Sequence, residues 1–110
     1  MNPFSFNEQR GDSRVNADYP VQITIGSQLT LQGQLKDISP KSAFITIKNS
    51  VYLELNDLVG FVIRLAPRDP RDFIQGHARV SRIAPGEGIA IYFTKMDEAH
   101  QTRLEDFFRQ

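Results

Sequence analysis

Apolar and polar residues alternate with a period of two along most of this chain, and this pattern constrains the fold more than any other feature. Successive side chains of a β-strand point to opposite faces, so a strand with one buried face shows this alternation. The apolar positions of six such segments are Val21, Ile23 and Ile25; Leu29, Leu31 and Leu35; Ala43, Ile45 and Ile47; Val59, Phe61, Ile63 and Leu65; Ile74, Ala78 and Val80; and Ile89, Ile91 and Phe93. The fifth segment belongs to a long strand predicted over residues 72–83.

Short turn sequences separate these segments. Gly26-Ser27-Gln28 lies between the first two and Pro85-Gly86-Glu87-Gly88 between the last two, and both are typical of hairpins. Six short strands with connections of this kind predict a small six-stranded antiparallel β-barrel, closed on itself.

The period changes after the sixth segment. Asp97 can cap a helix in which Leu104, Phe107 and Phe108 lie on one side. We expect this C-terminal helix to pack against the barrel or to cover one of its mouths. The predicted fold class is therefore all-β with a C-terminal helix.

A chain of 110 residues has the size of a single domain. No strand pattern precedes Pro20. We therefore divide the domain into an N-terminal arm, residues 1–19, and a barrel with its helix, residues 20–110.

Composition argues against several classes of function. Thirteen basic residues balance thirteen acidic ones, whereas sequence-independent binding to duplex DNA normally needs a basic excess. There is no cysteine, and His77 and His100 lie far apart, so no metal site is expected. The sequence contains neither a glycine-rich phosphate loop nor a nucleophile elbow, so we expect no enzyme, no catalytic residue and no cofactor.

The chain is also expected to be cytoplasmic. No apolar run approaches the roughly 20 residues that cross a bilayer. The first residues, Met1-Asn2-Pro3-Phe4, do not resemble a secretory signal.

Two polar groups are candidates for binding. Arg10 and Arg14 lie four apart on the arm, and Asp37 and Ser39 follow the second predicted strand. Arginine presents a planar fork of donors that suits phosphate oxygens and guanine edges, while a carboxylate accepts from guanine N1 and N2. Because Leu35 and Asp37 share a parity, we expect Asp37 to emerge at the end of the strand, where a loop can aim it at a ligand.

These residues resemble the motifs of the PilZ domain family, and the resemblance covers nearly the whole chain. The family's two arginines separated by three residues are matched by Arg10-Gly11-Asp12-Ser13-Arg14. Its second motif, Asp or Asn, any residue, Ser, two of any, then Gly, is matched by Asp37-Ile38-Ser39-Pro40-Lys41-Ser42 except at the last position. The late strand from Gly88 to Phe93, followed by a helix, is also similar.

The resemblance implies a PilZ-like barrel of the split-barrel type and a bacterial receptor for the second messenger cyclic di-GMP. It implies that the ligand-binding residues are Arg10, Arg14, Asp37, Ser39 and Ser42. Ligand binding would order the arm, and a downstream protein partner would read the new surface. The receptor is expected to be a monomer or a weak homodimer.

Ser42 departs from the glycine of the motif, and Pro40 restricts the residue before it. If the backbone at Ser42 needs a positive φ, serine costs about 1 kcal/mol. If only small size is required, serine is nearly neutral.

Two other functions stay open. The first is a PilZ-like adaptor that binds proteins but no longer binds cyclic di-GMP, for example in motility or pilus assembly. The second is a barrel that binds single-stranded nucleic acid, which the neutral charge and the inward parity of most phenylalanines disfavour.

Overall fold

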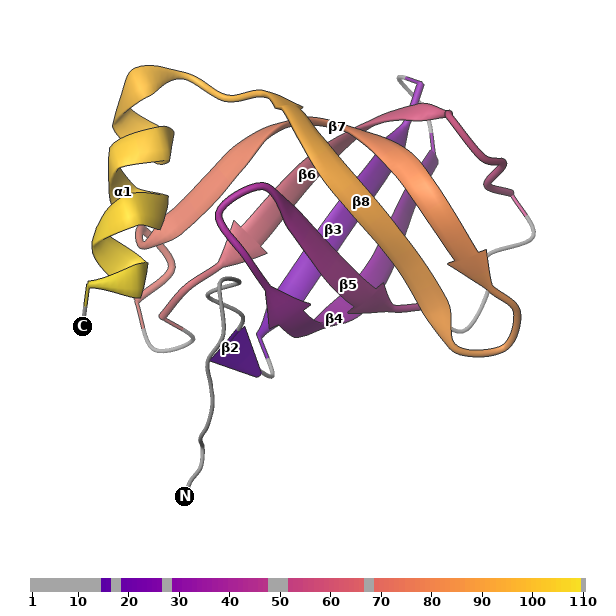
Figure 1. Cartoon of the computed structure of the whole chain (residues 1–110), viewed down its shortest axis with the longest axis horizontal. Coiled ribbons are helices and arrows are strands. Elements are labelled where there is room, and N and C mark those ends of the chain that lie inside the picture. The colour runs from indigo at the N-terminus through magenta and orange to yellow at the C-terminus, as the bar shows by residue number, and fades with distance from the viewer. Residues whose placement is uncertain (1–14, 17–18, 27–28, 48–51, 67–68, 110) are drawn as a thin grey trace.

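The computed structural model describes residues 15–16, 19–26, 29–47, 52–66 and 69–109 (Figure 1). The elements follow in the order β2 (Val15–Asn16), β3 (Pro20–Ile25), β4 (Leu29–Ile38), β5 (Ser42–Thr46), β6 (Leu58–Arg64), β7 (Phe73–Ala84), β8 (Gly88–Lys95) and α1 (Glu98–Phe108). Arg10 and Arg14 lie outside the described residues.

The strands form one closed antiparallel ring. Neighbours pair in the order β4, β3, β6, β7, β8 and β5, and β5 pairs again with β4. The predicted six-stranded antiparallel barrel with a C-terminal helix is thereby confirmed. β2 pairs with β4 outside this ring and was not predicted, because a strand of two residues shows no alternation.

The core fills the inside of the barrel. Most of the predicted inward positions are buried, including Ile74, Ala78 and Val80 of β7, each with none of its surface exposed. Phe61 is the largest of the fully buried side chains. The centre of its ring lies 4.9 Å from the centre of the ring of Phe93, which is partly buried. The alternation therefore located the inner face correctly over most of each strand.

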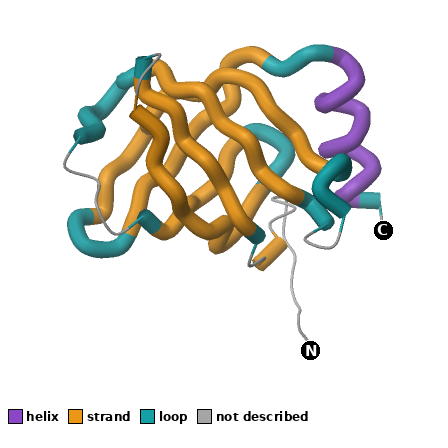
Figure 2. The backbone as a smooth tube through the Cα atoms, turned by 180° about the vertical axis from the view of Figure 1, so that it is seen from behind, coloured by secondary structure: helices purple, strands orange, loops and turns teal. Residues whose placement is uncertain are grey.

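Helix α1 packs at one end of the barrel, as Figures 1 and 2 show from opposite sides. Its N-cap is Asp97, as predicted, and the Asp97 carboxylate accepts a hydrogen bond from the His100 backbone N–H at 2.9 Å. Leu104 is buried in the core, and Phe107 and Phe108 pack partly buried against it.

An ion pair joins α1 to the connection between β6 and β7. Arg103 donates two hydrogen bonds to the Asp72 carboxylate, from Nε at 2.6 Å and from Nη2 at 2.9 Å. About a quarter of each side chain is exposed, 27% for Arg103 and 23% for Asp72. The hydrogen bonds from Arg103 outweigh the effect of partial burial and lower the pKa of Asp72.

We predict that Asp72→Asn lowers the free energy of unfolding by roughly 1–2 kcal/mol at neutral pH, as expected for a charge-assisted pair that water partly screens. Because the folded-state pKa of Asp72 is depressed, its stabilisation is complete above the unfolded value, near 4, and is lost as pH falls through the folded value. Urea unfolding from pH 7 down to pH 3 measures the difference between the two proteins.

The matched control is Asp69→Asn. Asp69 pairs with Arg71, whose side chain is 92% exposed, so this substitution should change the stability by less than about 0.5 kcal/mol. An Asp72→Asn effect that stays constant down to pH 3 would contradict the assignment.

Candidate functional site

The chain directly after Arg14 lies beside the second motif. Val15, the next residue in the sequence, lies opposite Ile38 in the β2–β4 ladder, and Asn16 lies opposite Asp37. The start of the described chain and the end of β4 are therefore hydrogen-bonded neighbours.

A β-bulge sets the direction of Asp37. The β4–β5 register passes from Leu35, opposite Ile45, to Asp37, opposite Phe44, which leaves Lys36 as an extra residue. Such a bulge reverses the inward and outward alternation beyond it.

The burial pattern agrees with this reversal. Leu35 and Ile38 are both fully buried, whereas Asp37 between them is only partly buried. We expected Asp37 to share the face of Leu35 and to emerge at the end of the strand. Asp37 instead lies within β4, and the bulge at Lys36 turns it away from the core.

Ser39 holds the turn that follows. It is 5% exposed, and its Oγ lies 3.0 Å from Ser42 Oγ. Ser39 Oγ also accepts from the backbone N–H groups of Ser42, at 3.1 Å, and Lys41, at 3.3 Å. The backbone N–H of Ser39 donates to the Ser42 carbonyl at 2.8 Å. In this conformation the Ser39 hydroxyl forms its hydrogen bonds with other groups of the turn from Ser39 to Ser42.

Ser42 begins β5, opposite Tyr92 of β8. Among the described residues, Asn56 is the non-glycine residue with a positive φ, so Ser42 lies outside the left-handed region. The backbone penalty considered for serine at this position therefore does not arise here. The Ser42 hydroxyl instead contributes to the turn through Ser39.

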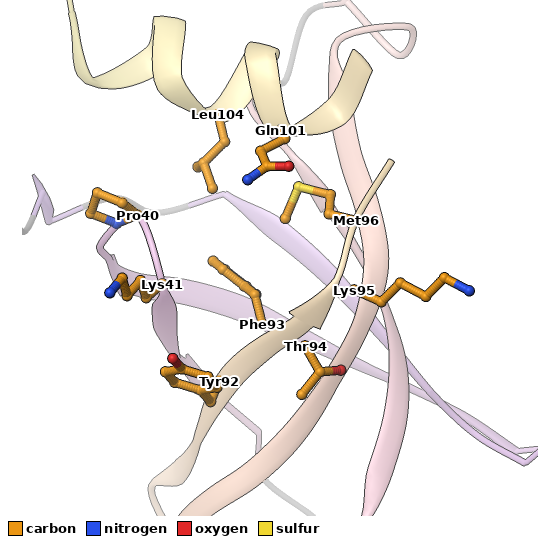
Figure 3. A pocket seen from close by; sticks show the side chains of 9 residues that line it. All are labelled: Pro40, Lys41, Tyr92, Phe93, Thr94, Lys95, Met96, Gln101 and Leu104. Atoms are coloured by element: carbon orange, nitrogen blue, oxygen red, sulfur yellow. The ribbon is translucent and has the colours of Figure 1, made fainter. Parts of the chain in front are cut away.

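The turn is also joined to β8. The Phe93 backbone N–H donates to the Lys41 carbonyl at 2.9 Å. A groove lies between this turn and α1, and Figure 3 shows Phe93 and Leu104 pointing toward one another across it, with Lys41 and Tyr92 on the side of the turn.

A row of side chains crosses the outer face of the barrel from Asp37. Asp37 lies opposite Phe44 of β5, Phe44 opposite Ala90 of β8, and Ala90 opposite Arg82 of β7. The Arg82 guanidinium carbon lies 5.3 Å from the centre of the Phe44 ring, within the range of a cation–π contact. Phe44 is only 8% exposed, although it does not belong to the core cluster.

These residues line one groove, in which a carboxylate and a guanidinium plane flank an aromatic ring. The other residues that line the groove are Lys36, Ala43, Glu87 and Ala90. The row can offer a planar base an acceptor for its N–H groups and a flat cationic surface on which to stack.

The structure brings together three of the five predicted site residues, Asp37, Ser39 and Ser42. Sequence reasoning missed Phe44 and Arg82. The signal for Phe44 was present, because an aromatic residue between the inward Ala43 and Ile45 must face outward. Arg82 follows a second register shift, between Val80 and Arg82, which the sequence pattern does not reveal.

The described part of the chain contains no cluster of three or more His, Asp or Glu side chains that could hold a metal ion. Within the same residues, no helix has the length and apolar character needed to span a membrane.

Comparison with known proteins identifies the family. The sequence profile of the PilZ domain matches residues 8–110, and the chain belongs to this family. PilZ domains are binding modules, which agrees with a site made of hydrogen-bonding and stacking groups. No curated protein matches the sequence significantly.

Solved structures share the fold. The structure of the Bacillus subtilis inhibitor of motility, MotI/DgrA, superposes with a TM-score of 0.74 at 18% identity over 92% of this chain and 50% of that one. The PilZ domain of YcgR from Escherichia coli, with c-di-GMP, gives 0.70 at 14% identity over 92% and 89%. The MrkH–c-di-GMP complex of K. pneumonia gives 0.69 at 16% identity over 92% and 51%.

The chain therefore spans about half the length of MotI/DgrA and MrkH. At these identities the likeness concerns the fold.

We predict that Ser39→Ala lowers the free energy of unfolding by about 1–3 kcal/mol, because it removes a buried hydroxyl and leaves the N–H groups it accepts from without that partner. Urea denaturation measures the loss. Ser81→Ala is the matched control, since Ser81 is exposed and its hydroxyl donates only to the Ala90 carbonyl, at 3.3 Å. Equal stability of the two variants would show that the Ser39 hydroxyl does not hold the turn.

Proposed function

We propose that this chain is a cyclic di-GMP receptor module that couples the level of the messenger to a protein partner. The observation that carries the proposal is the pairing of β2 with the end of β4. This pairing starts at the residue after Arg14 and runs alongside Asp37, which supports a site that takes residues from both motifs. Had the two segments been on opposite sides of the fold, one small ligand could not have engaged both.

Each site residue has a chemical role in this proposal. Arg10 and Arg14 donate to the phosphate oxygens and to guanine O6 and N7. Asp37 accepts from guanine N1 and N2. Binding orders the arm over the ligand, and the surface made by arm and ligand is read by the partner.

The serines act at different distances from the ligand in this proposal. Ser39 holds the turn and can contact the ligand directly only if its hydroxyl gives up a partner within the turn. Ser42 sits at the edge of the site, where its small side chain permits close approach.

Arg82 and Phe44 extend the site beyond the two motifs. The Arg82 guanidinium carbon lies 5.3 Å from the centre of the Phe44 ring, in the same cross-strand row as Asp37. A guanine that donates to Asp37 can lie along this row and stack on Arg82.

Similarity supports the choice of ligand. The YcgR PilZ domain and MrkH were solved with c-di-GMP, and the chain has the PilZ fold and most of both motifs. A receptor for this messenger is expected in the bacterial cytoplasm. Binding of the messenger requires neither catalysis nor a metal ion.

We predict that calorimetric titration of the purified chain with cyclic di-GMP gives a dissociation constant in the micromolar range or tighter. Arg14→Ala and Asp37→Ala should each weaken binding by at least about tenfold, since each removes a charge-assisted hydrogen bond. Arg71→Ala is the matched control, because Arg71 is exposed and lies outside the proposed site.

Thermal unfolding of the same variants separates binding from folding. Asp37→Ala should leave the melting temperature close to that of the wild type. A large fall would mean that Asp37 serves the fold. GMP and a single-stranded oligonucleotide test selectivity in the same titration.

We further predict that Arg82→Ala weakens cyclic di-GMP binding about tenfold, as expected for loss of one stacking surface. Arg82→Lys keeps the charge but not the plane, so it should recover only part of the affinity. Full recovery with lysine would show that the charge of Arg82 acts without stacking.

The second candidate function is the adaptor that does not bind the messenger. It is favoured by Ser42 in place of the motif's glycine. Absence of heat and of any melting shift at high concentrations of cyclic di-GMP would select this function.

A further inference from the structure

Four large hydrophobic side chains are exposed to solvent by about half or more. They are Tyr52 at 55%, Leu55 at 58%, Leu58 at 59% and Tyr92 at 49%, and they are the complete set of this kind among the described residues. Scattered exposed hydrophobic residues need no explanation, whereas a concentration of them marks an interaction surface.

Three of the four belong to the connection before β6 and its first residue. Figures 1 and 2 both show this connection at the end of the barrel away from α1. Its backbone is held in place: the Asn56 N–H donates to the Val80 carbonyl at 2.8 Å, and the Val80 N–H donates to the Asp57 carbonyl at 2.9 Å. Asp57 also accepts from the Glu54 N–H at 2.9 Å, and Leu53 anchors the connection in the core.

Asn56 takes a φ of 71° within this connection, a conformation that few residues other than glycine and asparagine adopt readily. These hydrogen bonds hold the backbone on both sides of Leu55 in place. Leu55 is therefore presented to solvent by an ordered backbone, which lowers the backbone entropy lost when it is covered.

Arg79 joins the fourth residue to the other three. In β7 it lies opposite Leu58 of β6 on one side and opposite Tyr92 of β8 on the other. Its Nη1 donates to the Asn56 carbonyl at 2.9 Å, which ties it to the connection. We call Tyr52, Leu55, Leu58 and Tyr92, with Arg79 and the exposed Glu54, the apolar patch.

We propose that the apolar patch binds a second copy of this chain across a two-fold axis. The patch carries both an acid, Glu54, and a base, Arg79, beside its hydrophobic residues. In a two-fold contact the same surface meets itself, so Glu54 of each copy can face Arg79 of the other. The contact is therefore complementary to itself in charge as well as in hydrophobicity.

A membrane surface fits the patch less well. Glu54 and Asp57 would lose water without gaining a partner there, and anionic headgroups would repel them. The contact rests on few large side chains, so it belongs to the small, weak class of interfaces, with a micromolar dissociation constant.

The test is sedimentation velocity of the full chain over a concentration series into the hundreds of micromolar, without nucleotide. We expect a reversible monomer–dimer equilibrium. The double substitution Leu55→Ser with Leu58→Ser should raise the dimer dissociation constant at least about tenfold, with thermal unfolding and circular dichroism confirming the fold.

Charge reversal tests the two-fold geometry. Glu54→Arg and Arg79→Glu should each weaken the dimer, because each places like charges opposite one another twice. An equimolar mixture of the two variants should restore it, because both contacts of the mixed pair again join opposite charges. Glu105→Arg, the same change at an exposed position on α1, should leave the equilibrium as in the wild type.

Several outcomes would overturn the proposal. They are a monomer at every concentration, a dimer that the leucine substitutions do not weaken, and a mixture no more associated than its parts. Cosedimentation with vesicles of neutral and anionic phospholipid that depends on Leu55 and Leu58 would assign the patch to a membrane instead. Because nucleotide is absent throughout, these results are independent of cyclic di-GMP binding.

Discussion

The antiparallel pairing of β4 with β5 is the constraint on which the rest of the structure depends. It closes the ring of strands, so that the inward residues form one sealed core. It also contains the bulge at Lys36, which places Asp37 on the outside while Leu35 and Ile38 stay buried. Closure of the barrel and orientation of the candidate site therefore come from the same few hydrogen bonds.

This arrangement separates stability from binding. The core uses the inner face of each strand, and the row from Asp37 through Phe44 to Arg82 uses the outer face, so its residues can change with little effect on the core. Ser39 is the exception. It belongs to the second motif by sequence, but its buried hydroxyl holds together the turn on which the site is built.

The sequence was sufficient to predict the barrel, the inner face of each strand and the helix with its cap at Asp97. Those features depend on periodicity and local hydrogen bonding, which a single segment of chain expresses by itself. It was not sufficient for β2 or for the role of Arg82, because both depend on which strand lies opposite, and pairing partners leave no local pattern.

Register shifts are the common cause of the remaining errors. The extra residue at Lys36 reverses the inward and outward alternation over the rest of β4, which is Asp37 and Ile38. Parity counted along the sequence places Asp37 on the same face as Leu35, whereas the bulge turns it outward. Ser39 and Ser42 are close because they lie in one turn. The burial of Ser39 also depends on β8, which joins this turn through the hydrogen bond from the Phe93 N–H to the Lys41 carbonyl. The ligand-binding roles of Arg10 and Arg14 remain predictions, because both residues lie outside the described part of the chain.

Closure of the ring has a consequence for how any other molecule can recognise this protein. A partner has little room to add a strand of its own, because each strand of the ring already pairs on both sides over much of its length, and β2 pairs with the end of β4 that β3 does not reach. Within the described residues, most backbone groups of the ring are thus committed, and a partner recognises the barrel mainly through side chains on its outer face. Specificity therefore changes with single substitutions on that face, while the scaffold beneath it stays the same.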